Sequence, residues 1–281
     1  MTRGLLLVLF AAVLLLPLLL LAPSGPTVLY EGESEFGPIR VTEDGRGVRR
    51  LYLGEGRAVQ TAMRPDQPLQ LHSPYTRVAM IGLGLAPADG RLLFVGLGGG
   101  AMPTYTRHVL PDARIDVVEI DPAVIDVAIT WFGFRPDSMM TAHPADGRAF
   151  IAAAAPGTWD VIFLDAFSDD AVPYALATAE FLEAVQRSLA PGGVVVSNLW
   201  RRNALYDDMV ATYRHVFPQV NVLGVPARAQ DILVAGTGGV PDRAALVRGA
   251  AAVTTPGFDL PGLVTSGYRS AAGTGTVLRD R

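Results

Sequence analysis

The sequence predicts an α/β fold in which a mostly parallel sheet follows a small antiparallel β domain. Three observations support this fold. Short apolar runs recur along the middle of the chain, helical segments separate them, and glycines or acidic residues follow several of the runs. Strands that are buried on both faces and alternate with helices are typical of βαβ units, which form parallel sheets.

The first elements are short β-rich runs that glycines separate, a pattern typical of β-hairpins. These runs cover residues 27–30, 39–42, 48–53 and 58–63. We therefore expect a small antiparallel domain over residues 27–64. Residues 65–87 are bounded by prolines, and their apolar residues indicate a buried helix.

The main domain is expected over residues 65–252. Its strands are expected at residues 92–95, 115–120, 161–164 and 194–198, and its helices at 102–109, 122–132, 147–154 and 176–189. Two closing hairpin strands are expected at 220–225 and 231–235, and a further helix at 242–252. The residues from 253 to 281 are rich in Gly, Ser and Thr, which predicts a loosely ordered tail.

Residues 1–26 differ from the rest of the chain. Residues 5–22 carry no charge, and only Pro17 interrupts them. A segment of this length is near the lower limit for a transmembrane anchor, and it also has features of a secretory signal peptide; a mis-assigned start codon is a third explanation. We therefore expect a membrane-anchored or exported protein that contacts the membrane through residues 5–22 if they are not cleaved. With Arg3 inside, the main domain would face outward, away from a cofactor that is made in the cytoplasm.

The composition excludes several classes of function. The 23 basic residues are all Arg, the net charge is -4, and no basic stripe is present, so we expect no nucleic-acid partner. The chain has no Cys and no Lys, which excludes thiolate metal sites, Schiff bases and a P-loop. The four histidines lack metal-ligand spacing, so we expect no metal and structural or exposed roles for them. The acidic balance suits a small cationic amine substrate.

The strongest chemical signal is the glycine-rich segment 94–101, which ends a strand and begins a helix. Gly96, Gly98 and Gly100 let the backbone turn sharply and approach a ligand, while the helix N-terminus offers free N–H groups. A tight turn without a ligand would use the same glycines. Glu119 follows Gly96 by 23 residues, which is near the spacing at which a carboxylate meets ribose hydroxyls.

Acidic residues also follow the later strands. Asp146 and Gly147 follow a further strand that is presumed between residues 120 and 146, and Asp165, Asp169 and Asp170 close the strand at 161–164. Ligands of open α/β folds bind at this edge of the sheet, although helix capping or a solvated loop would also explain such acids. Clustered carboxylates attract a polyamine, and their mutual repulsion raises one pKa. Asp165 or Asp169 could then take a proton from an amine near neutral pH.

Several motifs together resemble the spermidine synthases, the polyamine aminopropyltransferase family. They are the glycine-rich loop, V-V-E-I-D at 117–121, D-G-R-x-F at 146–150, W-D-V-I-F-L-D at 159–165 and L-A-P-G-G at 189–193. The resemblance covers most of residues 33–235 and implies a Rossmann-like class I S-adenosylmethionine-dependent methyltransferase fold. It implies that the nucleoside of decarboxylated S-adenosylmethionine, or of S-adenosylmethionine, is held by Gln60, Glu119, Asp146 and Gly147. We expect the acceptor to contact Tyr75, Asp170 and Tyr174, and the chain to form a homodimer.

The sequence departs from the family pattern at three acidic positions. Gly99 stands where the family has the acid of its G-G-G-D-G motif, and Arg77 replaces the Glu of Y-H-E. Ser168 occupies the fourth position of D-x-x-D-P, which makes Asp169 the candidate base. These changes argue against ordinary putrescine binding.

Three functions remain after these comparisons of motifs. The first is transfer of an aminopropyl group from decarboxylated S-adenosylmethionine to a polyamine amine, in which the protein mainly orients the reactants. The second is methyl transfer from intact S-adenosylmethionine, whose carboxylate would tolerate Gly99 better than an acid. The third is nucleoside binding by a membrane-tethered protein without catalysis.

Overall fold

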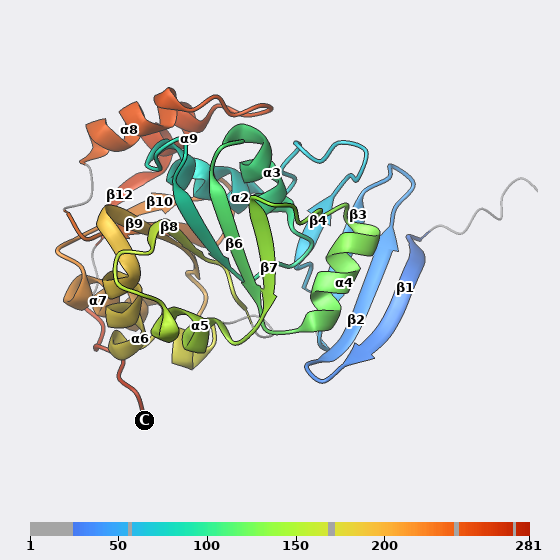
Figure 1. Ribbon diagram of the computed structural model, residues 1–281, viewed down its shortest axis with the longest axis horizontal. Coiled ribbons are helices and arrows are strands. Elements are labelled where there is room, and N and C mark those ends of the chain that lie inside the picture. Colours follow the sequence, from blue (N-terminus) through green and yellow to red (C-terminus); the bar gives the residue numbers. More distant parts are fainter. Residues whose placement is uncertain (1–24, 56–57, 168–171, 239–241, 272–273) are drawn as a thin grey trace, which may run out of the picture.

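The structure, a computed structural model, describes residues 25–55, 58–167, 172–238, 242–271 and 274–281. Within these ranges the chain forms a four-stranded antiparallel sheet and an eight-stranded mixed sheet, which lie side by side in Figure 1. The expected anchor or signal segment, residues 1–26, lies outside the described residues except for its last two. In the described ranges, no helix combines the length and apolarity that a membrane crossing requires.

The N-terminal sheet forms where the hairpin pattern predicts it. Its strands pair in chain order and are β1 (Thr27–Ser34), β2 (Gly37–Glu43), β3 (Arg49–Leu53) and β4 (Thr61–Met63). Alternation places Ile39, Val41 and Leu51 on one buried face. This face packs against Val124 and Val127 of helix α4 (Pro122–Trp131), so the small sheet is fixed to the large domain through α4.

The large sheet has the order β12-β10-β11-β9-β8-β5-β6-β7. Its parallel strands are β5 (Arg91–Val95), β6 (Arg114–Glu119), β7 (Met140–Pro144), β8 (Trp159–Leu164) and β9 (Leu189–Trp200). The antiparallel strands at one side are β10 (Gln219–Gly224), β11 (Gln230–Gly236) and β12 (Tyr268–Ser270). The predicted Rossmann-like α/β fold with a mostly parallel sheet is confirmed.

Helices cover both faces of this sheet (Figure 1). One layer contains α2 (Pro74–Ala79), the 3₁₀ helix η2 (Met80–Gly84), α3 (Ala101–Val109), α8 (Arg243–Ala252) and α9 (Leu260–Gly267). The other contains α5 (Gly147–Ala153), the 3₁₀ helix η3 (Tyr174–Leu176), α6 (Ala179–Ser188) and α7 (Tyr206–Val216). Successive strand residues alternate between these layers, because side chains of a strand point to opposite faces. Phe94 and Phe163 stack in the first layer with ring centroids 4.3 Å apart, and Val95 and Leu164 face the second.

The C-terminal residues differ from the expected loosely ordered tail over 253–281. Helix α9 begins at an Asp259 cap, β12 adds an edge strand, and residues 274–281 pack along α6 and α7. Leu260, Val264 and Leu278 are buried, and their burial stabilises a segment whose overall composition is typical of a loop. The sequence analysis also missed α7, although its buried residues Met209, Val210 and Tyr213 recur at helical spacing.

A buried ion-pair cluster joins the antiparallel strands. Asp231 of β11 is 1% exposed, and its carboxylate accepts hydrogen bonds from Arg201, Arg269 and Tyr206. Arg269 lies on β12, so the cluster connects the last strand of the sheet to β11. A buried carboxylate requires such partners because it has lost its hydration.

We predict that D231N is strongly destabilising, because it leaves two guanidinium groups without their buried counter-charge. The expected loss is about 3 kcal/mol in the free energy of unfolding, measured by urea titration. The matched control is D66N, which removes an acid from the exposed Arg64–Asp66 pair and should leave the urea midpoint unchanged. Equal midpoints for the two variants would contradict the prediction.

Candidate functional site

A cavity of about 360 Å³ lies between the carboxyl ends of the parallel strands and the small N-terminal sheet. The tips of β5, β6 and β8 supply its floor, because neighbouring parallel strands end at the same edge. The small sheet and the start of α2 supply the opposite wall. The acids that line the cavity are Glu119, Asp121, Asp146 and Asp165, and among its lining residues that the structure describes there is no Arg.

The glycine-rich loop connects β5 to α3 beneath this cavity. Gly96 has φ +94° and Gly98 has φ +52°, both in the left-handed region that glycine adopts readily. A Cβ atom at Gly96 would lie 2.5 Å from the carbonyl oxygen of Asp165, so only glycine allows the two strand ends to approach. Both glycines line the cavity, as predicted. Gly100 is not among the lining residues; it precedes α3 and faces Phe134, which corrects its expected place at the ligand.

Glu119 closes β6 and anchors the glycine-rich loop. One carboxylate oxygen accepts a hydrogen bond from the Leu97 N–H at 2.9 Å, and the other accepts from the Asp121 N–H at 3.2 Å. Burial raises the pKa of Glu119, while these two N–H groups act in the opposite direction. The next residue, Ile120, is 46% exposed and lines the cavity, so an apolar side chain borders the acid.

The remaining residues predicted to hold a nucleoside also line the cavity. Asp146 caps α5, because its carboxylate accepts a hydrogen bond from the Ala149 N–H at 2.7 Å. Asp146 therefore caps a helix and also lines the cavity, and its contact with a nucleoside stays a prediction. Gly147 lets α5 approach β5, since a Cβ there would lie 2.6 Å from Val95. Gln60 lines the cavity from the segment before β4.

A hydrogen-bonded acid occupies the other part of the cavity. Asp165, which follows β8, accepts hydrogen bonds from the Tyr75 hydroxyl and from the Asn198 side-chain amide, both at 2.9 Å. Burial raises the pKa of Asp165 to about 6, against the effect of these two donors. Burial also raises the pKa of Tyr75, with the Asp165 charge acting in the same direction, so the tyrosine remains a donor. The group can therefore exchange a proton near neutral pH.

Two residues of this region were missed by the sequence analysis. Asn198 lies on β9, and the signal for it was a polar residue near the end of a buried strand. His72 lines the cavity, and its Nε2 atom is buried without a hydrogen-bond partner among the described residues. Burial lowers the pKa of His72, and the positive charge of Arg77 lowers it further. The imidazole is therefore neutral at physiological pH.

The departures from the family motifs have different structural consequences. Arg77 is not a lining residue, because its guanidinium turns to donate a hydrogen bond to the Leu71 carbonyl at 2.6 Å. Gly99 donates its N–H to the Thr61 hydroxyl, and a Cβ there would lie 2.7 Å from Thr61 and 3.0 Å from Phe132. The Arg77 guanidinium thus does not enter the cavity. At position 99, the contacts with Thr61 and Phe132 leave no space for an acidic side chain.

Of the predicted acceptor and catalytic residues, one does not line the cavity and two lie outside the described residues. Tyr174 donates its hydroxyl hydrogen to the Arg279 carbonyl at 2.9 Å and is not a lining residue, so the structure gives no support for its assignment to the acceptor. Its neighbours Pro173 and Ala175 do line the cavity. Asp169 and Asp170 lie outside the described residues, as does Ser168. In the described part of the chain, no three potential metal ligands come together.

Comparisons with known proteins agree with this geometry. Residues 66–231 match the family described as the spermine/spermidine synthase domain. The chain is 33% identical over 235 residues to a polyamine aminopropyltransferase of Vibrio vulnificus (strain CMCP6), which covers 82% of this chain and 78% of that protein. It is 38% identical over 154 residues to the eEF1A lysine and N-terminal methyltransferase of Homo sapiens, which covers 50% of this chain but 22% of that protein.

Solved structures show the same fold. A probable spermidine synthase from Corynebacterium glutamicum ATCC 13032 has a TM-score of 0.73 at 22% identity and covers 91% of this chain and 97% of its own. Human methyltransferase-like protein 13 in complex with SAH has a TM-score of 0.60 at 31% identity, covering 68% of this chain and 92% of its own. The matched domain contains the glycine-rich loop, Glu119 and Asp165, and the chain belongs to the spermine/spermidine synthase family.

Proposed function

We propose that this chain transfers an aminopropyl group from decarboxylated S-adenosylmethionine to a small amine. The observation that carries the proposal is the charge of the cavity, which has four lining acids and no lining Arg in the described residues. The decarboxylated donor and a protonated amine are both cations, so an acidic cavity attracts both. An intact donor carries a carboxylate, and the described residues that line this cavity offer it no cationic side chain.

The nucleoside is proposed to bind at the tips of β5 and β6. Glu119 already holds the loop through one oxygen and stands at the strand end where a carboxylate of this fold type accepts hydrogen bonds from ribose hydroxyls. Ile120 supplies an exposed apolar surface next to it, suited to one face of a base. Asp146 and Gln60 would supply further polar contacts from two other sides of the cavity.

Asp165 is proposed to take the proton from the attacking amine. Because the acceptor binds as a protonated amine, the Asp165 carboxylate first removes one proton and frees the nitrogen lone pair. The nitrogen then attacks the carbon next to the sulfonium, the carbon–sulfur bond breaks, and the bonding electrons neutralise the sulfur as a thioether. The product is a secondary amine that keeps its remaining two protons, and Asp165 later releases its proton to solvent. Tyr75 and Asn198 orient that carboxylate from two sides, so the base is fixed before the acceptor arrives.

Methyl transfer from S-adenosylmethionine is a second candidate, and Gly99 favours it. The Thr61 and Phe132 contacts at position 99 exclude an acid that would bind the amine of a decarboxylated donor. The neutral His72 imidazole lies in the cavity wall and can donate a hydrogen bond to a carboxylate. The charge of the cavity favours the first candidate, and the shape of the loop favours the second.

The donor experiment separates the two candidates. Purified protein is incubated with putrescine, spermidine or cadaverine and with either donor, and chromatography measures methylthioadenosine and S-adenosylhomocysteine. We expect methylthioadenosine from the decarboxylated donor. Formation of S-adenosylhomocysteine alone would support methyl transfer, and release of neither product would reject both activities with these acceptors.

We predict that E119Q weakens nucleoside binding. A neutral amide cannot accept hydrogen bonds from ribose hydroxyls as strongly, and it loosens the loop at Leu97. The dissociation constant of methylthioadenosine, measured by calorimetry, should rise about 10-fold or more. E183Q is the control, since Glu183 is exposed on α6 and is not a lining residue. Equal affinities for the two variants would remove Glu119 from the proposed site.

We predict that the ionisation of Asp165 controls the acid side of the pH–rate profile. Its pKa is raised to about 6, so it is protonated and inactive as a base below that pH and ionised above it. The value of kcat/KM should fall about tenfold per pH unit below pH 6 and level off above it. D165N should lower kcat by about 100-fold or more and abolish this limb. The exposed Asp112 gives the control variant D112N, which should keep the limb; a limb that persists in D165N would show that another group is the base.

A further inference from the structure

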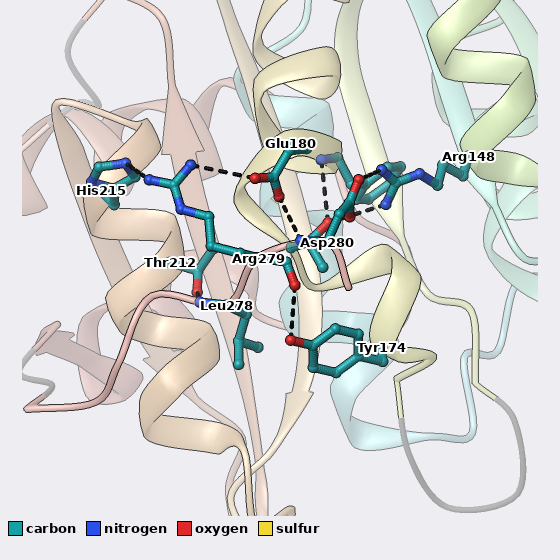
Figure 2. Close-up of polar contacts among 10 residues, drawn as sticks. Arg148, Tyr174, Glu180, Thr212, His215, Leu278, Arg279 and Asp280 are labelled. Carbon is teal, nitrogen blue, oxygen red and sulfur yellow. Dashed lines mark hydrogen bonds and ion pairs between the residues drawn. The ribbon is translucent and has the colours of Figure 1, made fainter.

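We infer that the last eight residues, 274–281, position one wall of the donor cavity. This segment, named here the C-terminal strap, lies along α6 and α7 and reaches the start of α5 and η3, as Figure 2 shows. The strap does not line the cavity itself. The strap would therefore act on the cavity through the residues that it contacts in α5 and η3. Its expected effect on nucleoside binding rests on the proposed function.

The strap is docked by backbone and apolar contacts. Leu278 is buried, its N–H donates to the Thr212 hydroxyl, and its carbonyl accepts from the Ala179 N–H, both at 2.9 Å. At Gly275 the strap approaches α7 so closely that a Cβ would lie 2.3 Å from the Asp207 backbone. A segment with these contacts has a defined register along the two helices.

Charged groups fix the end of the strap. Glu180 at the start of α6 accepts a hydrogen bond from the Asp280 N–H at 3.0 Å and one from Arg279 at 3.4 Å. The Arg279 guanidinium also lies 3.1 Å from Nε2 of His215 on α7 (Figure 2). These contacts hold the last residues against the N-terminus of α6 and the end of α7.

Two side chains connect the strap to the cavity wall. Arg148 in the first turn of α5 pairs with Asp280, and the same guanidinium donates to the Ala175 carbonyl at 2.6 Å (Figure 2). Tyr174 donates to the Arg279 carbonyl at 2.9 Å, and the Arg281 guanidinium lies 4.4 Å from the centre of its ring. The strap therefore bonds to both ends of a small unit formed by the start of α5 and by η3.

This unit is the part of the wall that faces the proposed nucleoside. The cavity is lined by Asp146 and Gly147 at the start of α5, and by Pro173, Ala175 and Leu176 around η3. Arg148 is one residue from Gly147, and Tyr174 lies between two lining residues. Undocking of the strap removes an anchor from each side of the wall, so strap docking and nucleoside binding should favour each other.

The first test needs no ligand and uses the variant G275A, whose methyl group cannot fit against α7. Its control is G45A, because a Cβ at Gly45 meets nothing within 4 Å. The amides of Leu176 and Ala177 are bonded to the Pro173 and Tyr174 carbonyls, so their hydrogen exchange reports the opening of η3. We expect about 10-fold faster exchange in G275A and unchanged exchange in G45A. Unchanged rates in G275A would overturn the inference whether or not the protein binds a nucleoside.

The second test measures the coupling to ligand with R148Q and its matched control R107Q. Arg107 also pairs with an aspartate and donates to a backbone carbonyl, the 27% exposure of its side chain matches the 29% of Arg148, and it is not a lining residue of the cavity. We expect R148Q to raise the dissociation constant of methylthioadenosine by about 5-fold or more, and R107Q to leave it unchanged.

The outcomes of this test separate the strap from the proposed function. A merely structural role would lower the melting temperature of both variants and change neither affinity, which would overturn the coupling. If R148Q does not fold, D280N tests the same connection, because it removes the Asp280 charge and leaves Arg148 bonded to Ala175. Absence of methylthioadenosine binding by the unmodified protein would reject the proposed function. The hydrogen-exchange test would then show by itself whether the strap holds η3 in place.

Discussion

The parallel pairing of β5 with β6 and β8 is the constraint on which the candidate site depends. Val95 is paired with Val118 on one side and Leu164 on the other, so the three strands end at one level. The residues that follow them are the glycine-rich loop, Glu119 and Asp165, which are distant in sequence and share one cavity. Glycine at position 96 is required at this level, because the Asp165 backbone leaves no space for a side chain.

Two buried polar groups at this site, Asp165 and His72, reduce the stability of the fold and are available for chemistry. Burial of Asp165 opposes its ionisation and raises its pKa to about 6, and Tyr75 and Asn198 offset this cost only in part. The unpartnered Nε2 of His72 has a similar cost, because a buried polar atom has lost its hydrogen bond to water. Buried polar groups with incomplete hydrogen bonding are typical of functional sites. Asp231 is a contrasting case, because three side chains donate hydrogen bonds to its buried carboxylate and its role is structural.

Most of the fold was predictable from the sequence because the strands β5, β6 and β8 are largely apolar runs that end at glycine or an acid, and β9 contains a further apolar run. The cavity-lining positions of Gly96, Gly98, Glu119, Asp146 and Gly147 were predictable for the same reason. Tyr174 was not, since its position is set by the strap residues 279–281, which are more than 100 residues away. The strap itself was missed because Val277 and Leu278 are two apolar residues in an otherwise polar segment, and the burial of Leu278 depends on the contacts with α6 and α7.

The central claim is that acids from successive strand tips surround one adenosine. Co-crystallisation with methylthioadenosine tests it most directly, since this nucleoside lacks the group that distinguishes the two donors. The account predicts ribose hydroxyls within hydrogen-bonding distance of Glu119 and the base against Ile120, with the sulfur directed toward Asp165. A nucleoside bound elsewhere on the molecule, with the cavity at the tips of β5, β6 and β8 empty, would contradict it.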